Sequence, residues 1–477
     1  MLIQHTLRYL PAQLLSPLAQ LLSMVLWTHW LSPQDMGVFT LVTVTQEIAY
    51  LLCLNWFSVY ALRYLPPAQD REGLRRYLVS ENVVVAAGTA AGVGVAGVTA
   101  WALAGDGEGL AAAAAIAAYF VTRSASAHYA ERARAQSAFM AFTWLQTAGP
   151  VGGLGIGLLV MQHVQADAWA LLWAYALAQA AGIALALPSL GMRWQWAAPD
   201  RVLLAAAARF GAPLIGLGVL GWIGENYIRY LVQWTEGAAA LGLMIVGWAL
   251  GRRCASVASM VVTTAAFPLA SRLLNEGRRD QALQQLRTNA ALLVAVLVPV
   301  TVAVELLGAT LVRLTVAEEY RALTTQMLAL SVFAGALRNL HMHVTDQLMV
   351  LERRFGMVAR IDVFEITVCT LASLAGLKLG GLHGAVIGQA FGSALALLLS
   401  VHWARTRLGF VWPVAETLKV LAASAMMALA LHALKAPQTL QGLILAVLVG
   451  SLAYAAAMAA LFWPDLRRLV AATRAAS

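Results

Sequence analysis

Long apolar runs separated by short polar turns dominate the chain. Fourteen runs of spanning length lie at approximately 9–31, 38–62, 79–104, 110–130, 138–162, 167–188, 210–232, 239–267, 288–309, 323–350, 357–377, 384–403, 415–433 and 440–462. A helix needs about 20 apolar residues to cross the hydrocarbon core of a bilayer. Backbone groups in lipid must also satisfy their own hydrogen bonds. The pattern therefore predicts an all-α polytopic membrane protein of about 14 transmembrane helices, because the runs lack the alternation of a transmembrane β-barrel.

Turn-forming residues mark the ends of these runs. They include Ser32-Pro33, Pro66-Pro67, Gly237 and Gly380-Gly381, which are residue types that end or break helices. The composition agrees, with 61% hydrophobic residues, 12% charged residues and a mean hydropathy of +0.73. The three cysteines lie far apart inside apolar runs, which favours buried thiols over a disulfide framework or a metal site.

Basic residues are unevenly distributed between alternate turns. The net charge is +9, from 32 Lys and Arg against 23 Asp and Glu. With the N-terminus taken as cytoplasmic, the predicted inside segments hold 23 basic residues, the outside turns hold 4, and 5 lie within spans. Because cytoplasmic loops carry an excess of Lys and Arg, this predicts an even number of spans with both termini in the cytoplasm. It also explains the basic charge without a nucleic-acid partner.

The connecting segments are short, the longest being about 20 residues. A membrane polymerase or ligase would need a large outer loop with basic and His residues, and none is present. The sequence also lacks a phosphate-binding loop, an H-E-x-x-H pair and a G-x-S-x-G turn. We therefore expect that the protein is not an enzyme and has no cofactor.

Five arginines interrupt the apolar runs: Arg123, Arg229, Arg252, Arg253 and Arg338. An ionisable group at membrane depth costs roughly 2.5–3.5 kcal/mol on insertion scales, so such groups usually face a cavity or one another. Guanidinium groups remain protonated and bind phosphate oxygens with two hydrogen bonds. The arginines therefore predict a cavity that binds an anionic substrate, although snorkelling and structural ion pairs remain alternatives for each of them.

Acidic residues and histidines also lie within the spans. Glu225 and Arg229 are spaced i and i+4, which predicts either a self-neutralising pair or a latch that releases Arg229 to a substrate. Candidates to bind a coupling H⁺ or Na⁺, or to neutralise the arginines, are Glu47, His341, His343, Asp346, Asp362 and Glu365. No third ligand with suitable spacing accompanies the two histidines and Asp346 of the tenth span, so we predict no metal site.

A faint internal repeat relates the two halves of the chain. Arg8-Tyr9 precedes a Pro and an apolar run that ends in SPQDMGVFTLV, and Arg209-Phe210 precedes a Pro and a run that ends in GAAALGLMIV. The offset that aligns Gly37 with Gly242 is 205 residues. Repeated halves with a substrate site between them are common in transporters.

Four segments carry a family resemblance in the same order along the chain: LSPQDMGVFTLV (31–42), ARFGAPLIGLGVLGWIGENYIRYLV (208–232), FPLASRLLNEGRRDQA (267–282) and GLHGAVIGQAFG (381–392). In these segments the chain resembles the oligosaccharide (O-antigen type) flippase and polysaccharide exporter family. The wider superfamily includes multidrug extruders and the peptidoglycan lipid flippase. The resemblance implies two pseudo-symmetric six-helix lobes, 1–200 and 201–410, followed by two C-terminal helices and a tail, 411–477.

The resemblance also implies a function. It predicts alternating-access transport of a polyprenyl-diphosphate-linked oligosaccharide across a bacterial inner membrane for surface polysaccharide export. Expected partners are this substrate, membrane lipid and other polysaccharide assembly proteins. Alternatives are a cation-coupled multidrug extruder of the same fold, for which we expect an acidic, aromatic-lined cavity with few arginines, and a non-transporting scaffold of a polysaccharide assembly complex.

Overall fold

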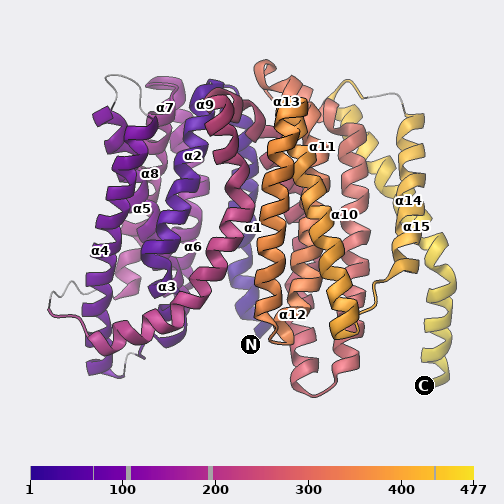
Figure 1. Ribbon diagram of the computed structural model, residues 1–477, viewed down its shortest axis with the longest axis horizontal. Helices are drawn as coiled ribbons and strands as arrows, with labels where there is room; N and C mark the ends of the chain where they lie inside the picture. Colours follow the sequence, from indigo (N-terminus) through magenta and orange to yellow (C-terminus); the bar gives the residue numbers. More distant parts are fainter. Residues whose placement is uncertain (1, 68, 104–108, 192–196, 435–436, 477) are drawn as a thin grey trace. The chain divides into compact units, whose positions relative to one another are not determined.

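The computed structural model describes the backbone of residues 2–67, 69–103, 109–191, 197–434 and 437–476, and their side chains except those of 2–14, 264–268 and 464–476. Every regular element in these ranges is a helix (Figure 1). Within these described residues, ten helices are long and apolar enough to cross a membrane by length and composition. The prediction of an all-helical membrane protein is therefore confirmed.

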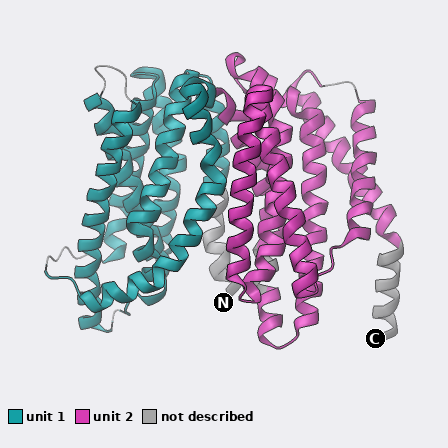
Figure 2. Cartoon of the chain, viewed as in Figure 1, with its two compact units in different colours: residues 1–242 teal, residues 243–477 magenta. Residues whose placement is uncertain are grey.

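The chain divides into two compact units, residues 1–242 and 243–477 (Figure 2). Unit 1 contains α1 (Leu2–Trp27), α2 (Pro33–Tyr50), η1 (Leu51–Asn55), α3 (Trp56–Tyr64), α4 (Arg71–Leu103), α5 (Gly109–Ala135), α6 (Phe139–Thr147), η2 (Ala148–Gly152), α7 (Gly153–His163), α8 (Ala168–Ala186), η3 (Leu187–Leu190) and the first part of α9 (Arg201–Asn275). Its central helix is α5, which packs against α3, α4, α6 and α8.

Unit 2 contains the rest of α9 and seven further elements in the part of the chain that the structure describes. These are α10 (Arg279–Thr315), α11 (Glu318–Leu340), η4 (His341–Asp346), α12 (Gln347–Leu351), α13 (Phe355–Leu408), α14 (Val414–Ala433) and α15 (Leu440–Ala476). Helix α10 packs against α11 on one side and against the α14–α15 pair on another. A buried cluster that includes Leu307, Met427, Leu431 and Leu443 holds the C-terminal pair in place.

Glycines break the two longest helices at the predicted turns. Gly237 in α9 has φ 87°, and Gly381 in α13 has φ 60°. Side chains with a Cβ rarely adopt this left-handed region, whereas glycine does so at little cost. Each long helix is therefore two consecutive segments joined by a tight turn. The start of α2 also follows the sequence signal, because Ser32 accepts a hydrogen bond from the Asp35 amide and Pro33 occupies the first helical turn.

Three π-helical turns interrupt spans in the described part of the chain. They are η1 between α2 and α3, η2 between α6 and α7, and η4 between α11 and α12. Such turns are rare and often occur at functional sites, because they change which side chains share a helix face. The apolar periodicity of the sequence does not predict them.

The repeated segments of the sequence contact each other at the start of α2 and just after the break in α9. A Cβ added to Gly37 would lie 2.0 Å from the Ala238 carbonyl oxygen, and one added to Gly242 would lie 1.8 Å from that of Pro33. The repeat offset of 205 residues aligns Pro33 with Ala238 and Gly37 with Gly242. The two contacts, Gly37 with Ala238 and Gly242 with Pro33, are therefore between equivalent positions of the two repeats. This reciprocity is the mark of a twofold contact, and small residues four apart are what allow two helices to approach so closely.

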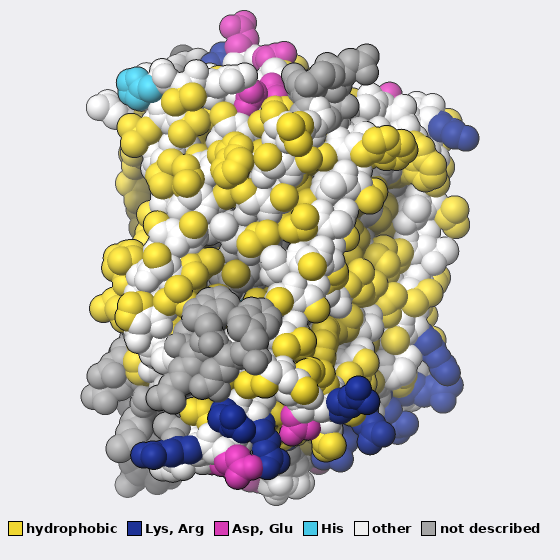
Figure 3. Space-filling model, turned by 90° about the vertical axis from the view of Figure 1, so that its left-hand side faces the viewer, with side chains coloured by type: hydrophobic (Ala, Val, Ile, Leu, Met, Phe, Trp, Pro, Cys, Tyr) yellow, Lys and Arg dark blue, Asp and Glu magenta, His cyan; other side chains and the backbone are white. Residues whose placement is uncertain are grey.

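The surface follows the pattern of a protein surrounded by lipid. On the face shown in Figure 3, hydrophobic side chains cover the middle, Lys and Arg gather toward the lower end together with a few Asp and Glu, and further Asp and Glu and a His lie at the upper end. Large apolar side chains such as Leu18, Trp101 and Leu398 are more than half exposed. An apolar band between polar ends is the pattern expected of a protein that spans a bilayer.

Candidate functional site

The densest buried charge in unit 2 surrounds Glu365. Its Oε2 lies 2.9 Å from the Arg338 guanidinium and 3.3 Å from His341 Nδ1, while Ser393 donates to its Oε1 at 3.1 Å. Arg338, His341 and Glu365 are all buried. A carboxylate removed from water needs such partners, because an isolated buried charge is strongly unfavourable. Helices α11 and α13 are therefore joined by a charged network rather than by apolar packing alone.

The π-turn η4 adds Asp346 to this network. His341 Nε2 lies 3.0 Å from Asp346 Oδ1, although the two residues are five apart in sequence. In an α-helix of 3.6 residues per turn, side chains five apart point about 140° away from each other. The wider π-turn turns them to the same side. Both ring nitrogens of His341 thus face carboxylate oxygens.

Asp362 completes the acidic side of the site. One ligand atom each of His341, Asp346 and Asp362 lie within 4.8 Å of one another, close enough to hold a metal ion by geometry. The tenth span offered no third ligand, and the structure supplies it from α13. Asp362 also interacts electrostatically with Arg338 and Glu365. Three carboxylates therefore share one guanidinium and one imidazole, an arrangement that can accept a further cation.

Arg252 lies on the second segment of α9, close to α11. Its guanidinium is 5.1 Å from the centre of the Trp248 ring, a cation–π distance, and Trp248 donates to Gln389 Oε1 at 2.7 Å. The close approach depends on Gly335, where an added Cβ would lie 3.3 Å from the Arg252 Cα. Cys369 interacts electrostatically with Glu365, Arg338 and Arg252, which places Arg252 beside the same network.

Unit 1 gathers a second set of predicted residues around two tyrosines. Tyr119 interacts electrostatically with Arg123 and Glu47, and Tyr230 with Arg229 and Glu47. The Tyr230 and Thr45 hydroxyls are 2.8 Å apart, which fixes α9 against α2. Glu47 is exposed, and the two arginines are half-buried. These side chains form a polar surface within predicted spans.

Sequence reasoning missed the most deeply buried charges of unit 1. The predicted spans 110–130 and 138–162 leave Arg132 in the turn between them, but it is 1% exposed, and Glu81 and His128 are 0% exposed. Arg132 forms an ion pair with Glu81 and donates to the Leu190 carbonyl at 3.0 Å. His128 Nε2 lies 3.0 Å from the other Glu81 oxygen. The charged spacing Glu131, Arg132 and Arg134 resembles a solvated helix end, so only the tertiary contacts show that Arg132 points inward.

The remaining predicted residues lie outside these contacts. Arg253 and Glu225 are half-buried on α9. His343 lies beside the unit 2 network, where Gln347 Nε2 is 3.5 Å from its Nδ1. The structure thus brings Arg338, His341, Asp346, Asp362 and Glu365 together in unit 2, and Arg123, Arg229 and Glu47 together in unit 1.

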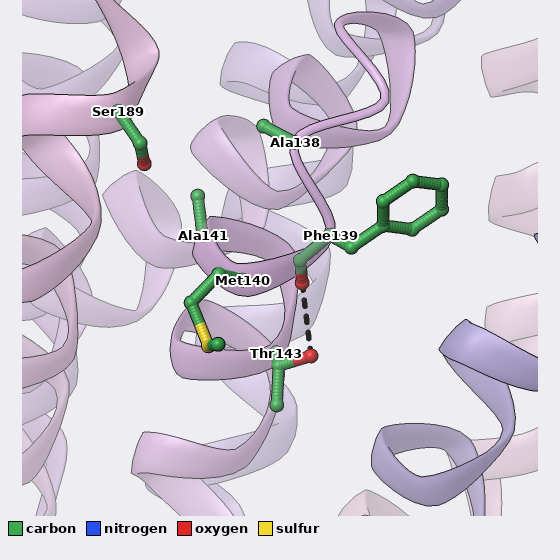
Figure 4. Close-up of a pocket in the computed structure, with 6 residues that line it drawn as sticks. All are labelled: Ala138, Phe139, Met140, Ala141, Thr143 and Ser189. Carbon is green, nitrogen blue, oxygen red and sulfur yellow. Dashed lines mark hydrogen bonds between the residues drawn. The ribbon is translucent and has the colours of Figure 1, made fainter.

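A pocket of about 490 Å³ lies between the start of α6 and η3 (Figure 4). Its lining residues are Ala138, Phe139, Met140, Ala141, Thr143 and Ser189. Thr143 donates to the Phe139 carbonyl at 2.9 Å, and the Phe139 ring points away from Ser189. All six are uncharged, so this pocket is poorly suited to a phosphate group.

A family model described as "Polysaccharide biosynthesis protein" matches residues 28–325. The chain belongs to this polysaccharide biosynthesis family. The match covers α2 through α10 and part of α11, and therefore includes Arg252 and the Glu81–His128–Arg132 cluster. No curated protein sequence matches the chain.

Solved structures share the fold of this polysaccharide biosynthesis protein. The lipid II flippase MurJ in an inward closed conformation has a TM-score of 0.71 at 10% identity, over 96% of this chain and 99% of that one. An inward-facing MATE family multidrug resistance transporter has a TM-score of 0.60 at 14% identity, over 83% and 94%. A MOP superfamily transporter from Pyrococcus furiosus has a TM-score of 0.54 at 14% identity, over 85% and 95%. The chain thus shares its fold with the lipid II flippase MurJ and with MATE family transporters.

Proposed function

We propose that the protein is a flippase for a polyprenyl-diphosphate-linked oligosaccharide. It carries the substrate from the inner to the outer leaflet of a bacterial inner membrane by alternating access, for export of a surface polysaccharide such as lipopolysaccharide or exopolysaccharide. The polysaccharide biosynthesis family and the MurJ-like fold support the transport role. The observation that carries the substrate class is the set of guanidinium groups within spans, because a diphosphate crossing a region of low dielectric needs fixed positive partners.

Arg252 is the foremost candidate for the diphosphate. It is held against the Trp248 ring, and a ring face leaves the edge of the guanidinium, with its N–H groups, able to bind oxygen. Arg123 and Arg229 supply positive charge in unit 1, with Arg253 as a further contact on α9. Arg338 forms an ion pair with Glu365, so its positive charge affects the electrostatic potential of the site mainly by neutralising that carboxylate.

The acidic part of the unit 2 network is the proposed site of a coupling H⁺ or Na⁺. Asp346, Asp362 and Glu365 outnumber their cationic partners, and a buried excess of negative charge favours uptake of a cation. Uptake there would change how strongly Arg338 and His341 are held. Glu47, Glu225 and His343 act as charge partners for the nearby arginines.

We further propose fourteen spans with both termini in the cytoplasm. The ten apolar spans become twelve when α9 and α13 are counted as two segments each, and α1 and the α11–α12 span supply the other two. The lobes are residues 1–200 and 201–410, followed by 411–477. Membrane lipid and other polysaccharide assembly proteins are the proposed partners besides the substrate.

The test is complementation of surface-polysaccharide export in a strain that lacks the protein. Arg252→Gln and Arg123→Gln each remove one positive charge from a predicted span. We expect normal membrane levels, loss of export, and accumulation of the lipid-linked sugar on the inner leaflet. Arg313→Gln is the matched control, because Arg313 is exposed at the end of α10 and donates to the Pro437 carbonyl.

Export equal to that of the control in both variants would exclude these arginines from the substrate site. If deletion instead raised drug sensitivity and left polysaccharide export intact, the multidrug extruder would replace the flippase. Normal transport of the lipid-linked sugar without the protein, combined with faulty assembly, would favour the scaffold.

A further inference from the structure

His128 lies in a part of unit 1 that the proposed substrate path does not use. Its ring is fully buried between α3, α4 and α5. Nε2 lies 3.0 Å from Glu81 Oε1, and Nδ1 lies 2.8 Å from Ser58 Oγ. The titratable and charged groups that face it are Glu81 and Tyr77 of α4, Arg132 and Tyr129 of α5, and, through Ser58, Tyr50 of α2.

The charges of this cluster balance when His128 is neutral. Arg132 binds one oxygen of the Glu81 carboxylate and His128 faces the other. The pair therefore needs no further charge to be stable in the membrane interior, and a proton on His128 adds one positive charge beside a carboxylate already in place. A carboxylate next to a histidine is the usual arrangement for a ring that gains and loses a proton.

Ser58 has one hydroxyl proton and two acceptors for it. Its Oγ is 2.8 Å from His128 Nδ1 and 3.2 Å from the Leu54 carbonyl. When His128 is neutral with its proton on Nε2, Nδ1 accepts a hydrogen bond from the Ser58 hydroxyl. When both ring nitrogens carry protons, Nδ1–H donates to Ser58 Oγ, and the Ser58 hydroxyl donates to the Leu54 carbonyl. The Tyr50 side chain also forms a hydrogen bond with Ser58.

The alternative acceptor lies in the π-turn η1. Leu54 is the fourth residue of the turn Leu51–Asn55. Two side chains donate to carbonyls there: Ser58 to Leu54, and the Trp56 indole to Cys53 at 3.2 Å. A serine that donates to the carbonyl four residues earlier often bends a helix, and here that carbonyl lies in a π-turn. The Ser58 bond is thus a direct link between the histidine and the bend in the α2–α3 span.

We propose that His128 is a proton-binding site, and that its protonation state sets whether Ser58 holds the π-turn Leu51–Asn55. Protonation adds one H⁺ to Nδ1, which then donates to Ser58 Oγ, and the Ser58 hydroxyl group rotates to donate to the Leu54 carbonyl instead of to Nδ1. Deprotonation reverses this, so that Ser58 again donates to Nδ1 and Leu54 loses this donor. Because α2 also carries Glu47, the proton is linked to the bend of the span that bears the polar surface of unit 1. The site goes beyond the flippase proposal and requires no sugar lipid.

The test uses the full chain in lipid nanodiscs, with 5-fluorotryptophan incorporated only at Trp56. The ¹⁹F chemical shift of this indole reports on the π-turn, since its N–H donates to Cys53. Titration from about pH 5 to about pH 9, the range in which histidines usually change charge, is expected to give one single-proton transition. His128→Gln is expected to abolish it.

Ser58→Ala keeps His128 and Glu81 and tests the link without removing the proton site. We expect the transition at Trp56 to disappear in this variant as well. Ser126→Ala is the control, because Ser126 is another buried serine of the same bundle, and its hydroxyl donates to the Leu145 carbonyl. It should retain the wild-type transition. A flat wild-type titration, or an unchanged transition in Ser58→Ala or His128→Gln, would overturn the proposal; if His128→Gln does not fold, Ser58→Ala alone decides.

Discussion

Tyr454 of α15 hydrogen-bonds to a backbone carbonyl of α10, and this contact gives a quantitative test of how the C-terminal pair is attached. Pro299 lies inside α10 and has no N–H. The carbonyl that an N–H at position 299 would bond is that of Ala295, four residues earlier. Tyr454 Oη donates to this carbonyl at 2.7 Å. The tyrosine therefore replaces the hydrogen bond that the proline removes, and Tyr454→Phe leaves the carbonyl without that donor.

The expected cost follows from hydrogen bonds in other membrane proteins. Side-chain hydrogen bonds within membranes contribute about 0.6 kcal/mol on average and up to about 1.7 kcal/mol. The Ala295 bond belongs at the upper end, because its carbonyl cannot be satisfied by its own helix and lies in an apolar environment. We expect Tyr454→Phe to lower the free energy of unfolding by about 1–2 kcal/mol, which changes the unfolding equilibrium roughly 5- to 30-fold.

A double-mutant cycle with Pro299→Ala isolates this contact. Alanine restores the N–H at position 299, so α10 can bond the Ala295 carbonyl itself, and Tyr454→Phe should then cost close to nothing. The measurement is reversible unfolding in mixed micelles, for the wild type, both single variants and the double variant. Equal costs of Tyr454→Phe in the two backgrounds would refute the reasoning, since the tyrosine would then act through packing alone.

Two further predictions concern unit 1. Gly37→Ala should destabilise the protein by more than about 2 kcal/mol in thermal unfolding, because the added methyl would lie 2.0 Å from a backbone oxygen. Gly221→Ala on α9 is the control and should be neutral or stabilising, since no atom lies within 4 Å of the added Cβ. Equal effects of the two substitutions would contradict the close crossing of α2 and α9. Glu81→Gln should lower the free energy of unfolding by about 3–5 kcal/mol, because it leaves the buried Arg132 guanidinium without a carboxylate. The double variant Glu81→Gln and Arg132→Met should recover part of that loss in the same unfolding assay. No recovery would mean that the two charges do not act as a pair.

The sequence predicted helix starts and ends correctly where a residue type strongly favours one local backbone conformation. Gly237 and the Gly380-Gly381 pair end helical segments because glycine alone enters the left-handed region easily, and the structure breaks α9 and α13 there. Ser32 and Pro33 likewise predicted the start of α2. The π-turns could not be predicted, because inserting one residue into an apolar span changes neither its length nor its hydropathy enough to notice.

The sequence predicted which residues form the candidate site, but it did not predict which of them contact one another. A charge within an apolar run is visible in the sequence, so Arg338, His341 and Glu365 were all identified. Their pairing was not, because α11 and α13 are brought together by tertiary packing, and because His341 and Asp346 meet only through a π-turn. Arg132 was missed for the opposite reason, since near a helix end an inward-pointing charge and a solvated one have the same local sequence.

The two buried clusters differ in charge balance, and this difference separates a structural role from a transport role. In unit 1, Glu81 and Arg132 neutralise each other, so the cluster is stable without any further ion and can respond to a proton through His128 alone. In unit 2, Asp346, Asp362 and Glu365 face Arg338 and one imidazole, so a further cation lowers its energy. A buried cluster that needs a cation changes state when the cation enters or leaves. On the proposed function, with a coupling cation bound in unit 2, we expect Asp362→Asn, which removes one negative charge, to weaken coupling of transport to the ion gradient while leaving the fold of unit 2 intact.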